Sequence, residues 1–179
     1  YSGPERHYHN LAHVAAMLRD QDTFDPVARG PAVTLAILLH DVVYDAQRPD
    51  NEAESAALAE RWLIELGLRS AFIDDVANLI RATDHRHDPE DLSAEARALI
   101  DLDLAILAAP DALYRAYAAG VANEYAHVPA HLFKEGRARV LTAFLARPRL
   151  YLTERAFNRW EPPARQNLRA EIERLLSST

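Results

Sequence analysis

The stretch Ala-Val-Thr-Leu-Ala-Ile-Leu-Leu-His-Asp-Val-Val-Tyr-Asp, residues 32–45, carries a His-Asp pair inside a strongly apolar segment. On a helix, residues three and four positions apart lie on the same face. The neighbours of His40 at that spacing are apolar or aromatic, namely Ala36, Ile37, Val43 and Tyr44. The pattern therefore predicts a buried imidazole. A buried Asp41 carboxylate beside it needs a cation or good hydrogen bonds to offset its lost hydration.

Apolar residues recur at three- and four-residue spacing along almost the whole chain, and period-two alternation over strand lengths is hard to find. The sequence therefore predicts an all-α fold. About seven to eight helices are expected, at about 10–20, 31–45, 51–66, 70–84, 93–108, 110–125, 130–146 and 162–177. Helix ends are indicated by Pro31, Gly67, Pro110-Asp111 and Pro148. Residues 85–92 are expected to form a polar loop, and residues 151–160 a connecting segment.

The length of 179 residues fits one domain better than two, so residues 1–179 are expected to form a single domain. The net charge of −7, without a stripe of Lys and Arg, argues against a nucleic-acid polymer as partner.

No apolar run approaches the length of a membrane span and no signal peptide opens the chain, so we expect a cytoplasmic protein that does not enter membranes. The apolar face of the last helix could serve a homodimer.

The chain has no Cys, so any metal must be held by His, Asp and Glu. His9 and His13 would share a face if a helix begins by His9. Asp103 has only apolar helical neighbours and is expected to be buried, whereas Asp101 faces Arg97 and could reach solvent.

One hypothesis accounts for the buried polar groups together: one divalent metal is bound by His13, His40, Asp41 and Asp103. Two imidazoles with two carboxylates suit Mn, Fe, Co, Ni or Zn, and open positions could hold water and substrate. The alternative is a buried hydrogen-bonded or ion-paired network that involves an Arg.

The order His13, then His40-Asp41, then a distant Asp103 on helices resembles the signature of the HD superfamily of metal-dependent phosphohydrolases. More narrowly, the chain is similar to a bacterial subgroup of small predicted HD phosphohydrolases without an assigned substrate. The resemblance covers about residues 7–125. The apolar face of the last helix predicts separately that helices 130–177 pack on this part. The resemblance implies hydrolysis of a nucleotide or another small phosphate ester by a metal-activated water.

Two further resemblances suggest catalytic roles. The stretch Tyr-His-Asn-Leu-Ala-His, residues 8–13, resembles a motif of cyclic nucleotide phosphodiesterases, which implies that His9 is a general acid and His13 a ligand. Asp45 resembles an acidic residue of guanosine tetraphosphate hydrolases, which implies that it orients the attacking water or acts as base. In those enzymes a Glu stands where this chain has Tyr44.

Substrate phosphate needs cationic or N–H donors, and three arginines lie near the motifs in the sequence: Arg6, Arg81 and Arg86. Some HD proteins hold a second metal with additional histidines, and by that resemblance Asp84 and His85 are candidates for such a site. One bound metal ion is expected, and the sequence leaves open whether a second is bound. His85 and His87 also motivate a di-iron oxygenase of the HD type as an alternative, and a third alternative is a non-catalytic metal-containing binding or regulatory module.

Overall fold

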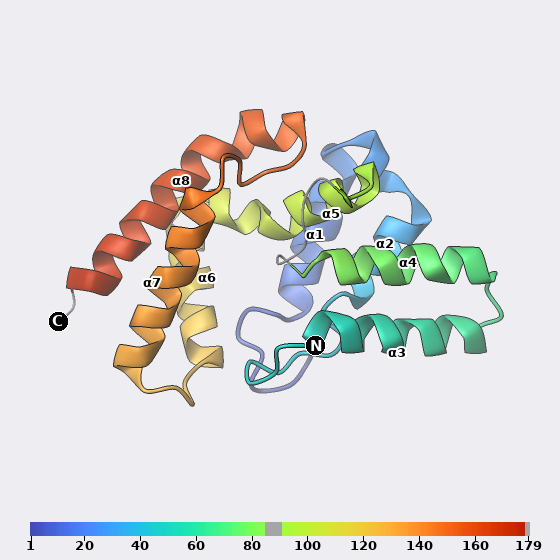
Figure 1. The fold of residues 1–179 in the computed structure, drawn as a ribbon, viewed down its shortest axis with the longest axis horizontal. Coiled ribbons are helices and arrows are strands. Elements are labelled where there is room, and N and C mark those ends of the chain that lie inside the picture. The colour runs from blue at the N-terminus through green and yellow to red at the C-terminus, as the bar shows by residue number, and fades with distance from the viewer. Residues whose placement is uncertain (85–90, 178–179) are drawn as a thin grey trace. The chain divides into compact units, whose positions relative to one another are not determined.

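In the computed structural model, which describes residues 1–84 and 91–177, all regular elements are helices (Figure 1). Eight α-helices lie within these residues: α1 (Leu11–Thr23), α2 (Pro31–Leu39), α3 (Asn51–Glu65), α4 (Ser70–Ala82), α5 (Ala94–Asp103), α6 (Asp111–Glu124), α7 (Ala130–Ala146) and α8 (Glu154–Ser177). Two 3₁₀ helices are η1 (Pro26–Arg29) and η3 (Leu104–Ala108). The all-α prediction is confirmed. Among the helices described, none combines the length and apolar character that crossing a membrane requires.

Internal contacts divide the chain into two compact units. The first unit consists of Tyr1–Ser2 and His9–Asp103, and the second consists of Gly3–Tyr8 and Leu104–Thr179. The division after Asp103 falls earlier than the end of the motif core expected at about residue 125. That the whole chain forms one domain stays a prediction.

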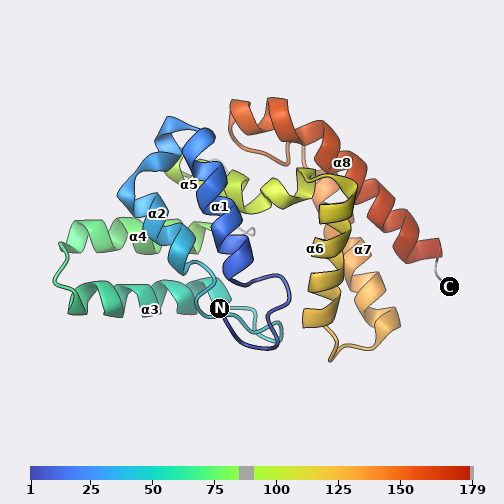
Figure 2. The same ribbon diagram turned by 180° about the vertical axis from the view of Figure 1, so that it is seen from behind.

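In the first unit, α4 lies between α3 and α2 as their common packing partner, and α3 runs beside α4 in both views of the ribbon (Figures 1 and 2). The turn between these two helices contains Gly67, whose φ of 71° lies in the left-handed region that glycine adopts without steric cost. Helix α5 contacts α1, α2, α4 and η1. The core of this unit is therefore built around α4 and α5, and it includes the fully buried Ile37 and Leu99.

Helix α2 ends earlier than the sequence indicated, at Leu39 instead of about residue 45. The reason is competition for backbone hydrogen bonds. The Ser55 hydroxyl on α3 bonds both the N–H and the C=O of Val43, and the Asn51 amide does the same for Asp45. These two residues thus have their polar backbone groups satisfied outside a helix, and the chain leaves α2 at the His-Asp pair.

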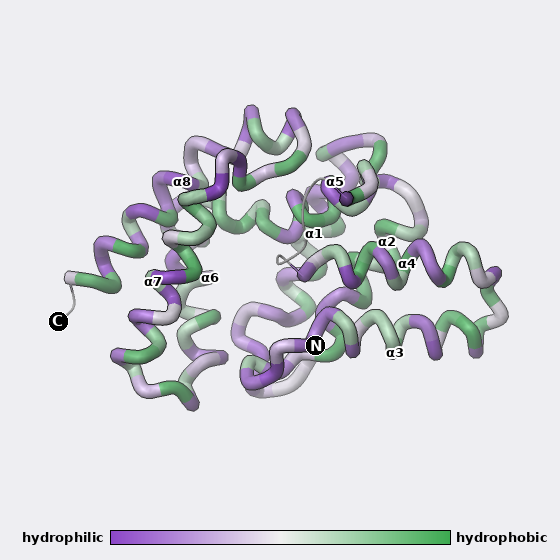
Figure 3. Tube along the Cα trace, viewed as in Figure 1, coloured by the Kyte–Doolittle hydropathy of each residue, from purple (hydrophilic) through white to green (hydrophobic). Residues whose placement is uncertain are grey.

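The second unit is organised by α8, which packs along α7 and η3. Hydrophobic and hydrophilic residues alternate along α8, as expected for a helix with one buried face (Figure 3). The helix begins at Glu154, so the expected connecting segment at residues 151–160 was wrong from that residue on. The Thr153 hydroxyl accepts a hydrogen bond from the Ala156 N–H and caps this earlier start, and Pro162 and Pro163 lie inside the helix.

Candidate metal centre

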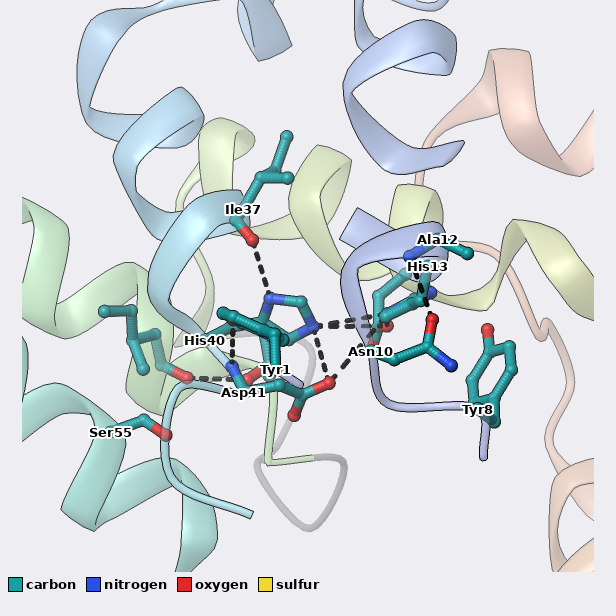
Figure 4. A network of polar contacts seen from close by, with 12 residues as sticks. Tyr1, Tyr8, Asn10, Ala12, His13, Ile37, His40, Asp41 and Ser55 are labelled. Atoms are coloured by element: carbon teal, nitrogen blue, oxygen red, sulfur yellow. Dashed lines mark hydrogen bonds and ion pairs between the residues drawn. The ribbon is translucent and has the colours of Figure 1, made fainter. Parts of the chain in front are cut away.

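His13 lies in the first turn of α1 and is buried. The helix begins at Leu11, because the Asn10 side chain accepts a hydrogen bond from the Ala12 N–H at 2.9 Å and so caps the free end. His9 therefore lies outside the helix, so the prediction that His9 and His13 share a helical face does not apply. The cap nevertheless fixes the position of His13 close to a helix end, where its imidazole faces inward (Figure 4).

His40 forms the end of α2, where its N–H still donates to the Ala36 carbonyl at 2.8 Å. Its ring nitrogen Nδ1 lies 3.0 Å from the Ile37 carbonyl oxygen, which can only accept, so Nδ1 donates (Figure 4). In the neutral ring the other nitrogen, Nε2, then carries the lone pair. A backbone carbonyl that fixes the tautomer in this way is the usual partner of a metal-binding histidine.

Four side-chain atoms from α1, α5 and the end of α2 come together at this place. The His13 Nε2 atom lies 3.3 Å from His40 Nε2 and 3.0 Å from Asp103 Oδ1. The Asp41 Oδ2 atom lies 3.1 Å from His40 Nε2 and 4.0 Å from His13 Nε2. The remaining distance, from His40 Nε2 to Asp103 Oδ1, is 3.8 Å. All of these contacts are made within the first unit.

This donor set fits a divalent metal. Bonds of about 2.1 Å from a metal to N or O separate neighbouring ligand atoms by about 3.0 Å in octahedral and 3.4 Å in tetrahedral geometry. Three of the distances around His13 and His40, at 3.0, 3.1 and 3.3 Å, fall in that range, and the other two, at 3.8 and 4.0 Å, are longer. One ligand atom each from His13, His40 and Asp41 can be chosen so that all three lie within 4.8 Å of one another, and Asp103 adds a carboxylate that contacts both histidines.

The electrostatics of the centre are those of a tightly coupled buried pair. Burial by itself lowers the pKa of His40, but the charge and hydrogen bond of Asp41, helped by the charge of Asp103, outweigh it and raise the pKa to about 9. For Asp41, burial acts to raise the pKa, and the positive charges of His40, His9 and His13 overcome it and hold that pKa well below its usual range. The pair is thus ionised when only protons occupy it.

For the two aspartates of α5, the more buried side chain is not the one that the sequence suggested. Asp101 is completely buried, whereas the Asp103 side chain keeps 17% of its accessible surface. The expectation that Asp101 could reach solvent was therefore wrong. The reason is tertiary: α5 is surrounded by α1, α2, α4 and η1, so the face that looked polar from helical spacing is covered as well.

His9 lies directly before the cap of α1, and its ring centroid is 6.2 Å from that of His13. On its other side it stacks on the ring of Tyr44, with centroids 4.1 Å apart and ring planes at 24°. The structure therefore brings the predicted general acid next to the predicted ligands. Asp45 is exposed, and its carboxylate accepts a hydrogen bond from the Gln47 N–H at 2.9 Å, which gives it a turn-forming role.

Two of the other predicted residues, Arg81 and Asp84, lie at the C-terminal end of α4. Asp84 follows the end of α4, where its N–H donates to the Arg81 carbonyl, and the Arg81 guanidinium pairs with Glu60 at 2.6 Å. Arg6 belongs to the second unit. The predicted second-metal ligand His85 and the predicted phosphate-binding Arg86 lie outside the described residues, as does His87.

Sequence reasoning missed the stack of Tyr44 on His9 and the hydrogen bonds of Ser55 to Val43. Ser55 is completely buried among small apolar residues of α3, and a hydroxyl at such a position must find a backbone partner. The sequence could therefore have indicated that Ser55 bonds the backbone, but it could not have identified Val43 as the partner.

Comparison of the chain with models of protein families, with curated proteins and with solved structures gave no match. Support for a function therefore comes from the residues and geometry of this centre.

Proposed function

We propose that this protein is a metal-dependent phosphohydrolase of the HD type, acting on a nucleotide or another small phosphate ester. One observation carries the proposal: the His13 and His40 Nε2 atoms, 3.3 Å apart, each lie within 3.1 Å of a different aspartate oxygen, in a largely buried setting. Two imidazoles with two carboxylates form a donor set for Mn, Fe, Co, Ni or Zn.

The chemistry that this set supports is hydrolysis. A divalent ion held there would lower the pKa of a water molecule and offset negative charge on the phosphoryl oxygens. The residues of the chain supply the rest. Asp41 and Asp103 offset the charge of the ion, and the Ile37 carbonyl keeps the His40 ring in the orientation that presents Nε2. His9, whose ring lies beside that of His13, would donate a proton to the leaving oxygen.

The test is phosphate release by protein loaded separately with each candidate metal, using a panel of nucleotides and small phosphate esters. We expect turnover by the wild type, and its loss in His40→Ala with the fold retained. His131→Ala is the matched control, because this exposed histidine on α7 belongs to the second unit and should leave turnover unchanged. Circular dichroism of each variant separates loss of chemistry from loss of fold.

Absence of phosphate release from folded, metal-containing wild type, in an assay where a known hydrolase is active, would reject the proposal. Tight binding of a panel member without turnover would then favour a binding or regulatory module that retains the metal.

A further inference from the structure

The segment that follows the His-Asp pair is held in place by two side chains of α3. The Ser55 hydroxyl donates to the Val43 carbonyl and accepts from the Val43 N–H, both at 3.1 Å. The Asn51 amide donates to the Asp45 carbonyl and accepts from the Asp45 N–H, both at 2.9 Å. Asn51 and Ser55 are one helical turn apart, and Val43 and Asp45 are alternate residues of an irregular segment. Two side chains of one helix thus bond the backbone of alternate residues, as a neighbouring strand does in a β-sheet.

This arrangement fixes the residue between the two paired positions. Tyr44 has neighbours on both sides whose backbone N–H and C=O groups are satisfied by the same helix. Its ring then meets the imidazole of His9 in a near-parallel stack, with centroids 4.1 Å apart. His9 precedes the N-cap of α1 and lies outside the helix, so helical geometry does not set the direction of its ring. The contact with Tyr44 supplies such a constraint.

We propose that Tyr44 is a positioning residue that holds the His9 imidazole beside the His13–His40–Asp41–Asp103 cluster, where it protonates leaving groups that need an acid. This inference rests on the proposed function and narrows its substrate class. An enzyme with a held acid is suited to esters of poor leaving groups, such as alkyl phosphates and nucleoside monophosphates. A nitrophenolate departs without a proton and gains little from one.

The stack can be tested without any turnover. In a metal-free NMR spectrum the His9 ring protons, assigned by their loss in His9→Gln, should be shifted upfield by the Tyr44 ring. Tyr44→Phe keeps an aromatic ring at the position and should preserve the shift. Tyr44→Leu fills similar space without a ring current and should abolish it. Unchanged His9 resonances in Tyr44→Leu would overturn the proposal, because no stack would then hold the imidazole.

The second measurement is a leaving-group comparison on the metal-loaded enzyme. We expect Tyr44→Leu to lose about 10- to 100-fold in kcat toward an alkyl phosphate, the scale of a misplaced catalytic group. Its kcat toward 4-nitrophenyl phosphate should change little, and Tyr44→Phe should be close to wild type with both substrates. His9→Gln should show the same selectivity as Tyr44→Leu. Metal content and melting temperature are measured for every variant.

If Tyr44→Leu lowers kcat equally with both substrates, the positioning role is overturned in favour of a purely structural one. If the wild type hydrolyses neither these two substrates nor any member of the wider panel, the proposed function fails and the acid role of His9 fails with it. If it hydrolyses other panel members but not the alkyl phosphate, the inferred substrate class fails while the proposed function stands. The NMR comparison still decides whether Tyr44 holds the ring, so the two failures remain distinguishable.

Discussion

The Nε2 atoms of His13 and His40 face each other at 3.3 Å in a centre where both rings are almost fully buried. Two unprotonated Nε2 atoms would repel each other at that distance, so the pair calls for a proton or a metal cation between or beside them. A proton fills this role in the metal-free protein, since the Asp41 and Asp103 carboxylates favour a charged His40. A divalent metal could fill the same role, held by the group of His13, His40 and Asp41, and the proposed function adds Asp103 as a fourth ligand.

Removing one ligand should remove the metal. We expect protein purified without chelator to carry about one equivalent of a transition metal, by elemental analysis. His40→Ala and Asp103→Asn should each weaken binding by at least about 10- to 100-fold, because changes to residues that merely support a ligand already have that effect. His131→Ala, exposed in the second unit, should retain the wild-type content. Folded wild type that takes up none of Mn, Fe, Co, Ni or Zn would favour the buried-network alternative.

Metal binding should release a proton near neutral pH. The pKa of His40 in the metal-free centre is raised to about 9, since Asp41 and Asp103 outweigh the opposing effect of burial. The metal needs the neutral ring, so below this pKa each binding event must displace the His40 proton, and affinity should fall about tenfold for each pH unit of acidification. Calorimetry in two buffers with different protonation enthalpies measures the number of protons. A value near zero at neutral pH would mean that His40 is already neutral before the metal arrives.

The sequence was informative wherever a feature depended on residues close together in the chain. Apolar spacing around His40 predicted its burial, and Pro31 and Gly67 marked helix ends that the structure confirms. The end of α2 could not be read in this way. It depends on Ser55 and Asn51, whose side chains compete for the backbone of a segment about ten residues earlier.

The burial of Asp101 could not be predicted for a related reason. Helical spacing describes what a residue meets on its own helix, and there Asp101 has the polar neighbour Arg97. What covers Asp101 is decided by the helices that pack around α5 from other parts of the chain. The stack of His9 on Tyr44 is likewise a contact between segments that no local pattern records.

Two glycines should respond in opposite directions to the same substitution. Gly67 has a φ of 71°, so Gly67→Ala forces a side chain into the left-handed region and should lower the free energy of unfolding by about 1–2 kcal/mol. Gly136 lies inside α7, and an added Cβ meets no atom within 4 Å. Gly136→Ala should raise the free energy of unfolding by about 0.5–1 kcal/mol, since alanine loses less entropy in a helix. Urea titrations followed by circular dichroism give both values, and the same sign for both would contradict this account.

Arg137 should matter far more to stability than an arginine in an exposed pair. It donates to Glu171 at 2.8 Å, and their side chains keep only 10% and 7% of their accessible surface. Tyr114 also donates to Glu171, and Arg137 reaches the Tyr117 hydroxyl at 3.1 Å, so the network joins α6, α7 and α8. Arg137→Met leaves a buried carboxylate without its cation, which should cost about 3–5 kcal/mol of unfolding free energy.

The matched control is Arg115→Met. Arg115 pairs with Asp111 at 2.9 Å on α6, with side chains that keep 61% and 62% of their surface. Solvent screens such a pair, so its loss should cost less than about 1 kcal/mol. The double variant Arg137→Met with Glu171→Gln should recover much of the loss, because no buried charge is then left uncompensated and the amide oxygen can still accept from the Tyr114 hydroxyl. Equal costs for the two single variants would mean that water reaches Glu171 once Arg137 is gone, and the double variant would then gain nothing over Arg137→Met.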